Sequence, residues 1–111
     1  MAYNEYLADR VRDALRKTPN VEEKKMFGGL AFMVNDKMCV TICNDRMMFR
    51  VDPELHEELL QSRPCKTAIM AGREYKGYLH VESIDLEDGE NFEYWVSLAL
   101  DFNERAKSSK G

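Results

Sequence analysis

Apolar and charged positions alternate with helical spacing at the start of the chain. Apolar side chains recur every three or four residues from Tyr3 to Leu15, with arginines and carboxylates between them. This spacing predicts an amphipathic helix over residues 3–17. Asn4 is placed to cap its first turn, and Pro19 ends it.

Three apolar runs separated by Asn-Asp pairs follow this helix. Residues 24–34, 37–43 and 46–51 are rich in Met, Phe and Val, and the dipeptides at 35–36 and 44–45 join them. Asn and Asp favour tight turns, and β-branched and aromatic residues favour strands. The pattern therefore predicts a three-stranded antiparallel meander.

Alternation divides the side chains of these strands between two faces. One face is predicted to carry Met38, Val40, Ile42, Met47, Phe49 and Val51. The other face is predicted to carry Cys39, Thr41, Cys43, Met48 and Arg50. Because methionine is flexible and polarisable, we expect the second face to offer an adaptable, exposed binding surface.

The rest of the chain predicts a helix, a hairpin and a last helix. The expected bounds are 52–64 for the helix, 67–70 and 75–84 for the strands, and 92–102 for the last helix. Asp52 is a helix cap followed by Pro53 at the first helical position. The predicted order is α-β(3)-α-β(2)-α, a two-layer α+β fold with helices packed on one antiparallel sheet. We expect residues 1–106 to form a single domain and 107–111 a disordered tail.

The composition fits one domain in a reducing compartment. The chain has 111 residues, of which 44% are apolar and 32% charged, and this is enough apolar surface for one core. Its apolar runs are far shorter than the ~20 residues of a membrane-spanning helix. Three cysteines cannot form a fully paired disulfide framework, which favours the cytoplasm.

The distribution of charge bears on the choice of partner. The net charge of −4 disfavours direct nucleic-acid binding, which usually needs a clearly basic face. The densest basic group is a weak candidate interaction surface and comprises Arg10, Arg12, Arg16, Lys24 and Lys25. The alternative is a solvated helix face, because carboxylates are interleaved with these residues.

Five side chains suit a metal site or nucleophilic catalysis, and their spacing argues against both. They are Cys39, Cys43, Cys65, His56 and His80. In a strand, Cys39 and Cys43 would lie ~13 Å apart, too far to share one zinc ion. Neither histidine lies in a recognised catalytic motif. We therefore expect no metal, no cofactor and no catalytic residue.

A glycine pair and an acidic segment also have structural interpretations. Gly28 and Gly29 precede strand residues rather than a helix, unlike a phosphate-binding loop, so a bulge or a close backbone approach is the alternative. The carboxylates of residues 82–93 do not follow the spacing of a calcium-binding loop. Such carboxylates are favoured before a helix N-terminus.

Four segments closely resemble the N-terminal domain of the TfoX/Sxy family. They are KKMFGGLAFMVNDKMCV, FRVDPE, the Lys-Gly-Tyr stretch at 76–78, and YWVSLALDFN. The resemblance runs from about Lys24 to Asn103. Its identifying residues, for which we expect structural roles, are Met26, Phe27, Gly28, Gly29, Lys76, Gly77, Tyr94 and Trp95.

The resemblance implies both a fold and a type of function. The fold would be the two-layer arrangement shared with secretion-chaperone-like proteins, in agreement with the predicted element order. Named family members regulate competence genes together with a cyclic-AMP-dependent transcription activator, and they do not act as enzymes. Two-domain members continue into a helical second domain, whereas this sequence stops at Gly111. We expect a stand-alone copy of the N-terminal domain.

Three functions are consistent with these observations. The first is a non-enzymatic regulatory module that binds another protein, or a second copy of itself, through a sheet face or edge. The second is a small-ligand binding protein or an unrecognised enzyme, with His80, Tyr78 or Arg50 lining a cleft between sheet and helices. The third is direct nucleic-acid binding through the basic first helix, which the net charge disfavours.

Overall fold

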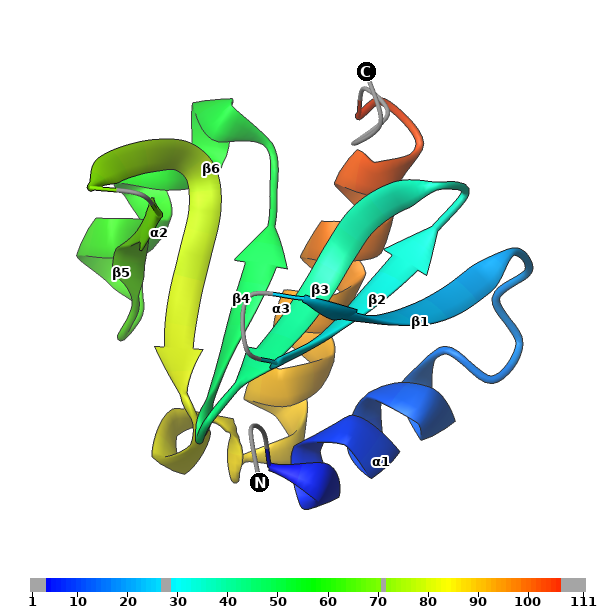
Figure 1. Cartoon of the computed structure of the whole chain (residues 1–111). Coiled ribbons are helices and arrows are strands. Elements are labelled where there is room, and N and C mark those ends of the chain that lie inside the picture. The colour runs from blue at the N-terminus through cyan, green and yellow to red at the C-terminus, as the bar shows by residue number, and fades with distance from the viewer. Residues whose placement is uncertain (1–3, 27–28, 71, 107–111) are drawn as a thin grey trace.

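The computed structural model describes residues 4–26, 29–70 and 72–106, and the predicted tail at 107–111 lies outside this part (Figure 1). The helices are α1 (Glu5–Ala14), α2 (His56–Ser62) and α3 (Gly89–Asn103), with short 3₁₀ turns η1 (Pro53–Leu55) and η2 (Ser83–Leu86). The strands are β1 (Val21–Met26), β2 (Gly29–Val34), β3 (Lys37–Cys43), β4 (Arg46–Arg50), β5 (Lys66–Met70) and β6 (Arg73–Glu82). The predicted α+β class is confirmed.

All described strands belong to one antiparallel sheet in the order β1-β2-β3-β4-β6-β5. The prediction of three strands in the first group is wrong, because two strands, β1 and β2, occupy the place of the single strand predicted over residues 24–34, and β1 begins earlier, at Val21. β1 and β2 pair antiparallel, with Met26 opposite Gly29. A Cβ at Gly29 would overlap the carbonyl oxygen of Ile42, which confirms a close backbone approach at Gly29, whereas Gly28 lies outside the described residues.

Two turns connect the strands where the Asn-Asp pairs predicted them. Asn35 and Asp36 have φ of 55° and 64°, and Asn44 has φ of 55°. These left-handed conformations suit two-residue hairpins and are tolerated best by Asn, Asp and Gly. The local sequence therefore determines both reversals.

An irregularity between β2 and β3 changes which side chains share a face. Phe32 pairs with Val40, but the next residue, Met33, pairs with Met38. Cys39 is therefore the extra residue of a bulge. Cys39 joins the helix-side core together with Val40, and Met38 lies on the opposite face. The predicted faces are wrong at these two positions, because simple alternation assumes an unbroken ladder.

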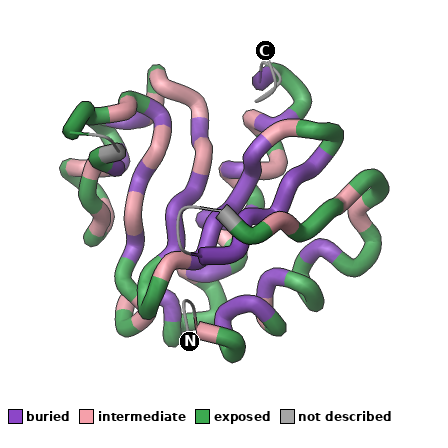
Figure 2. Tube along the Cα trace, in the orientation of Figure 1, coloured by how far each residue is buried: buried purple, intermediate pink, exposed green. Residues whose placement is uncertain are grey.

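The main core lies between the sheet and the helices (Figure 2). Leu7 and Val11 of α1, Leu59 of α2 and Trp95 of α3 are buried against it. Trp95 is completely buried and stacks on Phe49 of β4, with 5.4 Å between the ring centroids. The helices therefore cover one face of the sheet.

The opposite face of the sheet carries a second, smaller apolar cluster. Its buried members are Ala31, Met33, Met38, Met48 and Ala68. Thr41, between Ala31 and Met48 in the sheet, is 2% exposed. The expectation of an exposed methionine surface is thus wrong for Met48 and Thr41, because the folded chain itself removes these side chains from solvent.

Candidate binding groove

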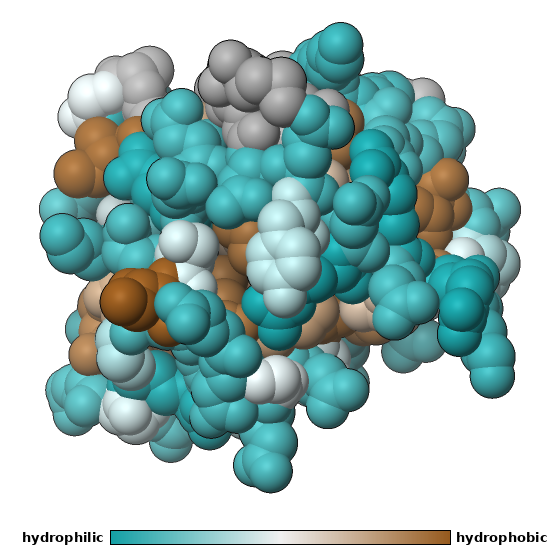
Figure 3. All heavy atoms as spheres, turned by 90° about the horizontal axis from the view of Figure 1, so that it is seen from below, coloured by the Kyte–Doolittle hydropathy of each residue, from teal (hydrophilic) through white to brown (hydrophobic). Residues whose placement is uncertain are grey.

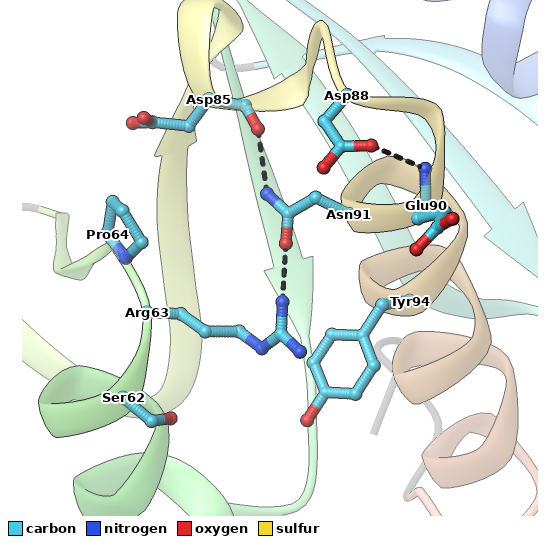
Figure 4. A pocket seen from close by; sticks show the side chains of 8 residues that line it. All are labelled: Ser62, Arg63, Pro64, Asp85, Asp88, Glu90, Asn91 and Tyr94. Atoms are coloured by element: carbon cyan, nitrogen blue, oxygen red, sulfur yellow. Dashed lines mark hydrogen bonds between the residues drawn. The ribbon is translucent and has the colours of Figure 1, made fainter.

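An open groove lies where the end of α2 approaches the beginning of α3 (Figure 4). It has a volume of about 680 Å³. Its lining residues are Ser62, Arg63, Pro64, Asp85, Asp88, Glu90, Asn91 and Tyr94. The groove therefore joins segments that are more than twenty residues apart in the sequence.

Arg63 is the central side chain of the groove and is held on two sides. Its Cζ lies 3.6 Å from the centroid of the Tyr94 ring, and its Nη1 donates a 2.7 Å hydrogen bond to Oδ1 of Asn91. Figure 4 shows the guanidinium beside the ring and directed at the amide. An arginine that is stacked on an aromatic ring and held by a hydrogen bond is already restricted to few rotamers before a partner binds.

The start of α3 positions the other polar groups. Oδ1 of Asp88 accepts a 3.0 Å hydrogen bond from the Glu90 N–H, so Asp88 is the N-cap. Asn91 donates from Nδ2 to the carbonyl oxygen of Asp85 across 2.7 Å. This bond orients the Asn91 amide so that its oxygen faces Arg63. The acidic segment that the sequence assigned to a helix start does have this structural role.

Carboxylates outnumber cations around the groove. Asp85, Asp88 and Glu90 line it with Arg63 as the basic residue. Asp85 points away from Asn91 in Figure 4, which leaves its carboxylate beside the groove rather than inside the Asn91 contact. The groove thus combines an acidic rim with a fixed guanidinium and aromatic ring, a polar arrangement that suits charged or hydrogen-bonding groups.

Large hydrophobic side chains are exposed at separate places. Among the described residues they are Tyr6 on α1, Ile69 on β5 and Ile84 on η2. Figure 3 shows one face of the molecule, on which hydrophilic side chains dominate and the hydrophobic ones form separate patches. That face therefore offers no broad apolar area of the kind that obligate interfaces bury.

The family-identifying residues fall into different structural settings. Trp95 fills the core, and its neighbour Tyr94 lines the groove. Gly77 has φ of 91°, a conformation that glycine adopts most readily, whereas Lys76 is exposed. Phe27 and Gly28 lie outside the described residues, as does the side chain of Met26.

His56 has a structural role that sequence reasoning did not identify. It is 3% exposed and links three elements: Nδ1 accepts from the Gly77 N–H at 2.8 Å, and Nε2 lies 2.8 Å from Oγ1 of Thr67. Because a backbone N–H can only donate, Nδ1 carries no proton and Nε2 is the donor to Thr67. Both ring nitrogens are therefore engaged in contacts that join α2 to β5 and β6.

Two members of the predicted basic group have polar contacts within the chain. Arg10 turns inward, since its Nη1 donates to the Leu86 carbonyl at 2.7 Å and its Cζ lies 4.1 Å from the Phe92 ring centroid. Arg12 binds both carboxylate oxygens of Glu23 at 2.8 Å. Arg12 thereby lies beside β1, which also carries Lys24 and Lys25, and Arg16 follows the end of α1. A role of these residues in partner binding stays a prediction.

Burial determines the acidity of two of the cysteine thiols. Burial raises the pKa of the Cys39 thiol to about 12, with a smaller opposing effect of Arg50, and burial also raises the pKa of Cys65. Within the described part of the chain, no group of three or more His, Cys, Asp or Glu side chains is arranged to hold a metal ion. Cys39 is a core side chain whose thiolate is strongly disfavoured.

Two of the three side chains proposed for a ligand cleft do not lie between sheet and helices, whereas Cζ of the third, Arg50, lies 5.8 Å from the ring centroid of Phe102 on α3. Leu79 and Val81 belong to the helix-side core, so His80 between them points to the opposite face. Tyr78 packs against the small cluster on that same face. The expectation that these two residues line a cleft beneath the helices is therefore wrong.

Arg63 and Asn91 were not identified from the sequence as groove residues. Arg63 precedes a proline at a helix end, which indicates only a boundary. Its contacts with Tyr94 and Asn91 bridge 31 and 28 positions of the chain. No local pattern reports such a contact, since it depends on how α2 and α3 pack on the sheet.

Fold and groove together define an α+β domain whose helices cover one sheet face and meet at a polar groove. The TfoX N-terminal domain family matches residues 13–103, and the chain belongs to this family. No curated protein matches the sequence. None of the helices in the described part of the chain is both long and apolar enough to cross a membrane.

Proposed function

We propose that this domain is a non-enzymatic regulatory module that acts in the cytoplasm by binding another protein through the groove between α2 and α3. Membership of the TfoX N-terminal domain family supports a module of this type. The finer part of the proposal is a link to transcription or competence regulation, as in the named TfoX/Sxy members. Direct nucleic-acid binding is disfavoured by the net charge of −4.

The preorganised Arg63 is the observation that carries this proposal. Its guanidinium is stacked on Tyr94 and hydrogen-bonded to Asn91 in the free chain. Side chains ordered before binding lose less entropy on association, and Arg and Tyr are enriched among the residues that dominate binding energies. The groove therefore presents a ready anchor for a protein segment.

The rim of the groove indicates the chemistry of that segment. Asp85 and Glu90 add negative charge beside Arg63. A segment with a Lys or Arg side chain would find carboxylates at the rim, and its backbone carbonyls would find the guanidinium. Such contacts suit a transient, salt-sensitive regulatory complex.

Affinity capture from native lysate tests the proposal. The wild-type domain is expected to retain a specific protein that Arg63→Ala and Tyr94→Ala lose by at least about tenfold, the effect of removing a binding anchor worth ~1.4 kcal/mol or more. Arg73→Ala is the matched control, because Arg73 is an exposed arginine on β6 and does not line the groove. Equal capture by all four proteins would contradict a role of the groove.

The captured protein must then be tested with purified components. A binding titration of the captured protein with the Asp85→Asn variant tests the rim separately from Arg63. The substitution removes one negative charge and keeps the shape of the side chain. Weaker binding of this variant at low salt, with the difference reduced at high salt, is expected for a basic segment. A domain that is well folded and binds no protein would refute the interaction-module proposal.

A further inference from the structure

β1 is an edge of the sheet, and its outward backbone groups can be identified. β1 pairs only with β2 in the described sheet, with Val21 opposite Val34. The Asn35 N–H donates to the Asn20 carbonyl just before this pair, so position 20 is directed toward β2. Because the direction alternates along an antiparallel strand, the N–H and C=O groups of Val21, Glu23 and Lys25 point away from β2.

The side chains along this edge have an unusual order of charge. Residues 22–25 read Glu-Glu-Lys-Lys, and Glu22, Glu23 and Lys25 are exposed. Charges on an edge strand usually discourage pairing with other strands. An acidic half followed by a basic half, however, is complementary to itself when a second copy runs antiparallel.

Symmetry restricts how two copies of β1 can pair. In an antiparallel pair, residues directly opposite each other point to the same face of the sheet, and a two-fold axis perpendicular to the sheet keeps each face on its own side. Two residues can therefore lie opposite each other only if both have odd numbers or both have even numbers. With Glu23 on the axis, Glu22 of each copy lies opposite Lys24 of the other, and Val21 lies opposite Lys25.

This register leaves no unbalanced charge on the axis. The two Glu23 carboxylates would face each other, but each already receives two 2.8 Å hydrogen bonds from Arg12 of its own chain. Arg12 also lowers the pKa of Glu23, through a hydrogen bond and through its charge. The register with Lys24 on the axis would place Glu23 opposite Lys25, but Glu23 is already bound by Arg12, and the two Lys24 ammonium groups would be opposed with no carboxylate of β1 between them.

We propose that the chain forms a symmetric homodimer in which two β1 strands pair antiparallel about Glu23 and join the two sheets into one. Each copy contributes the Glu22 and Lys24 side chains to two ion pairs across the interface. Neither side chain has an ion pair with another described residue of its own chain. The pairing would leave the groove between α2 and α3 open, and it does not depend on the function proposed for the groove.

The expected dimer is weak and salt-sensitive. Pairing along a strand of 6 residues buries less area than the ~1,200 Å² of a standard stable interface. Exposed ion pairs are screened by salt. The dimer should therefore form at high protein concentration and low ionic strength.

Sedimentation equilibrium of the full chain tests the pairing through charge reversal. Lys24→Glu places carboxylates opposite each other at two symmetric points and is expected to weaken dimerisation by tenfold or more. The double variant Glu22→Lys/Lys24→Glu exchanges the two charges and is expected to restore it. Ile69→Lys, on the exposed part of the opposite edge strand β5, is expected to leave dimerisation unchanged.

Hydrogen exchange provides a second measurement that locates the interface. The amides of Val21, Glu23 and Lys25 should exchange more slowly as protein concentration rises, and those of β5 should not. A wild-type chain that stays monomeric up to millimolar concentration at low salt would overturn the proposal. So would a folded Lys24→Glu variant that dimerises like the wild type, or a double variant that fails to recover.

Discussion

The backbone N–H of Gly77 donates a hydrogen bond to Nδ1 of His56 across 2.8 Å. This bond joins a glycine of the family-identifying Lys-Gly pair to a histidine at the start of α2. The other ring nitrogen contacts Thr67 of β5. Gly77 has a positive φ of 91°, a conformation that glycine adopts most readily, and its N–H is directed at the buried ring.

Replacement of His56 by Leu is expected to lower the free energy of unfolding by about 2–3 kcal/mol. Leucine fills much of the same space but leaves the buried Gly77 N–H without an acceptor, and this cost exceeds the loss of an average hydrogen bond. Thr67→Val, which removes only the acceptor for Nε2, should cost about 1 kcal/mol. Urea denaturation of the three proteins measures both values. Equal stability of His56→Leu and the wild type would contradict this role.

Gly29→Ala is expected to destabilise the chain by about 2 kcal/mol or more, because the new Cβ overlaps the Ile42 carbonyl and the backbone must shift. Gly89→Ala is the control: its Cβ would meet no atom within 4 Å. In the first turn of α3, alanine should be neutral or stabilise by about 0.5 kcal/mol. Thermal unfolding of both variants distinguishes the positions, and similar behaviour would contradict the close approach.

Thr41→Val is expected to stabilise the chain by up to about 1 kcal/mol. Oγ1 of Thr41 is buried and has no hydrogen-bond partner among the described residues, and valine has the same shape without the polar atom. The contrasting variant Thr41→Ser keeps the hydroxyl, removes the methyl group and should destabilise. A loss of stability in Thr41→Val would show that the hydroxyl has a partner, such as water.

The stability of the fold should fall on acidification partly because of His80. Burial, with a further contribution from the Arg46 charge, lowers the pKa of His80 below its ordinary 6.5, and Glu82 opposes the shift. Between the lowered pKa and 6.5, the unfolded chain binds more protons than the folded one, so the free energy of unfolding rises with pH. His80→Gln should flatten this part of the profile. An unchanged slope of the free energy of unfolding against pH would contradict a lowered pKa of His80. Because the carboxylates are the same in the variant and the wild type, their contribution cancels in this comparison.

Cys39 should resist alkylation in the native protein. Cys39 is 1% exposed, and burial raises the pKa of its thiol to about 12, so very little of the reactive thiolate is present at pH 8. In urea all three cysteines should react. Peptide mapping by mass spectrometry after iodoacetamide treatment gives the extent at each position, with the partly exposed Cys43 as the internal reference. Rapid native labelling of Cys39 would indicate that its strand opens.

Local sequence determined the features that depend on neighbouring residues. The cap at Asn4 accepts hydrogen bonds from Tyr6 and Leu7, as its position predicts, and the turn at Asn35 follows from residues that tolerate a positive φ. The element order of the second half and the burial of Trp95 follow from periodicity in the same way. These signals act within one turn or one strand.

Tertiary structure decided the features that depend on register and on distant contacts. The bulge at Cys39 exchanges the faces of that residue and Met38, because strand pairing, not alternation alone, fixes which side chain points to the core. Arg63 reaches Tyr94 only because α2 and α3 pack on the same side of the sheet. The sequence by itself determined the family and the fold class, whereas the groove arises from contacts between segments whose separation along the chain carries no local signal.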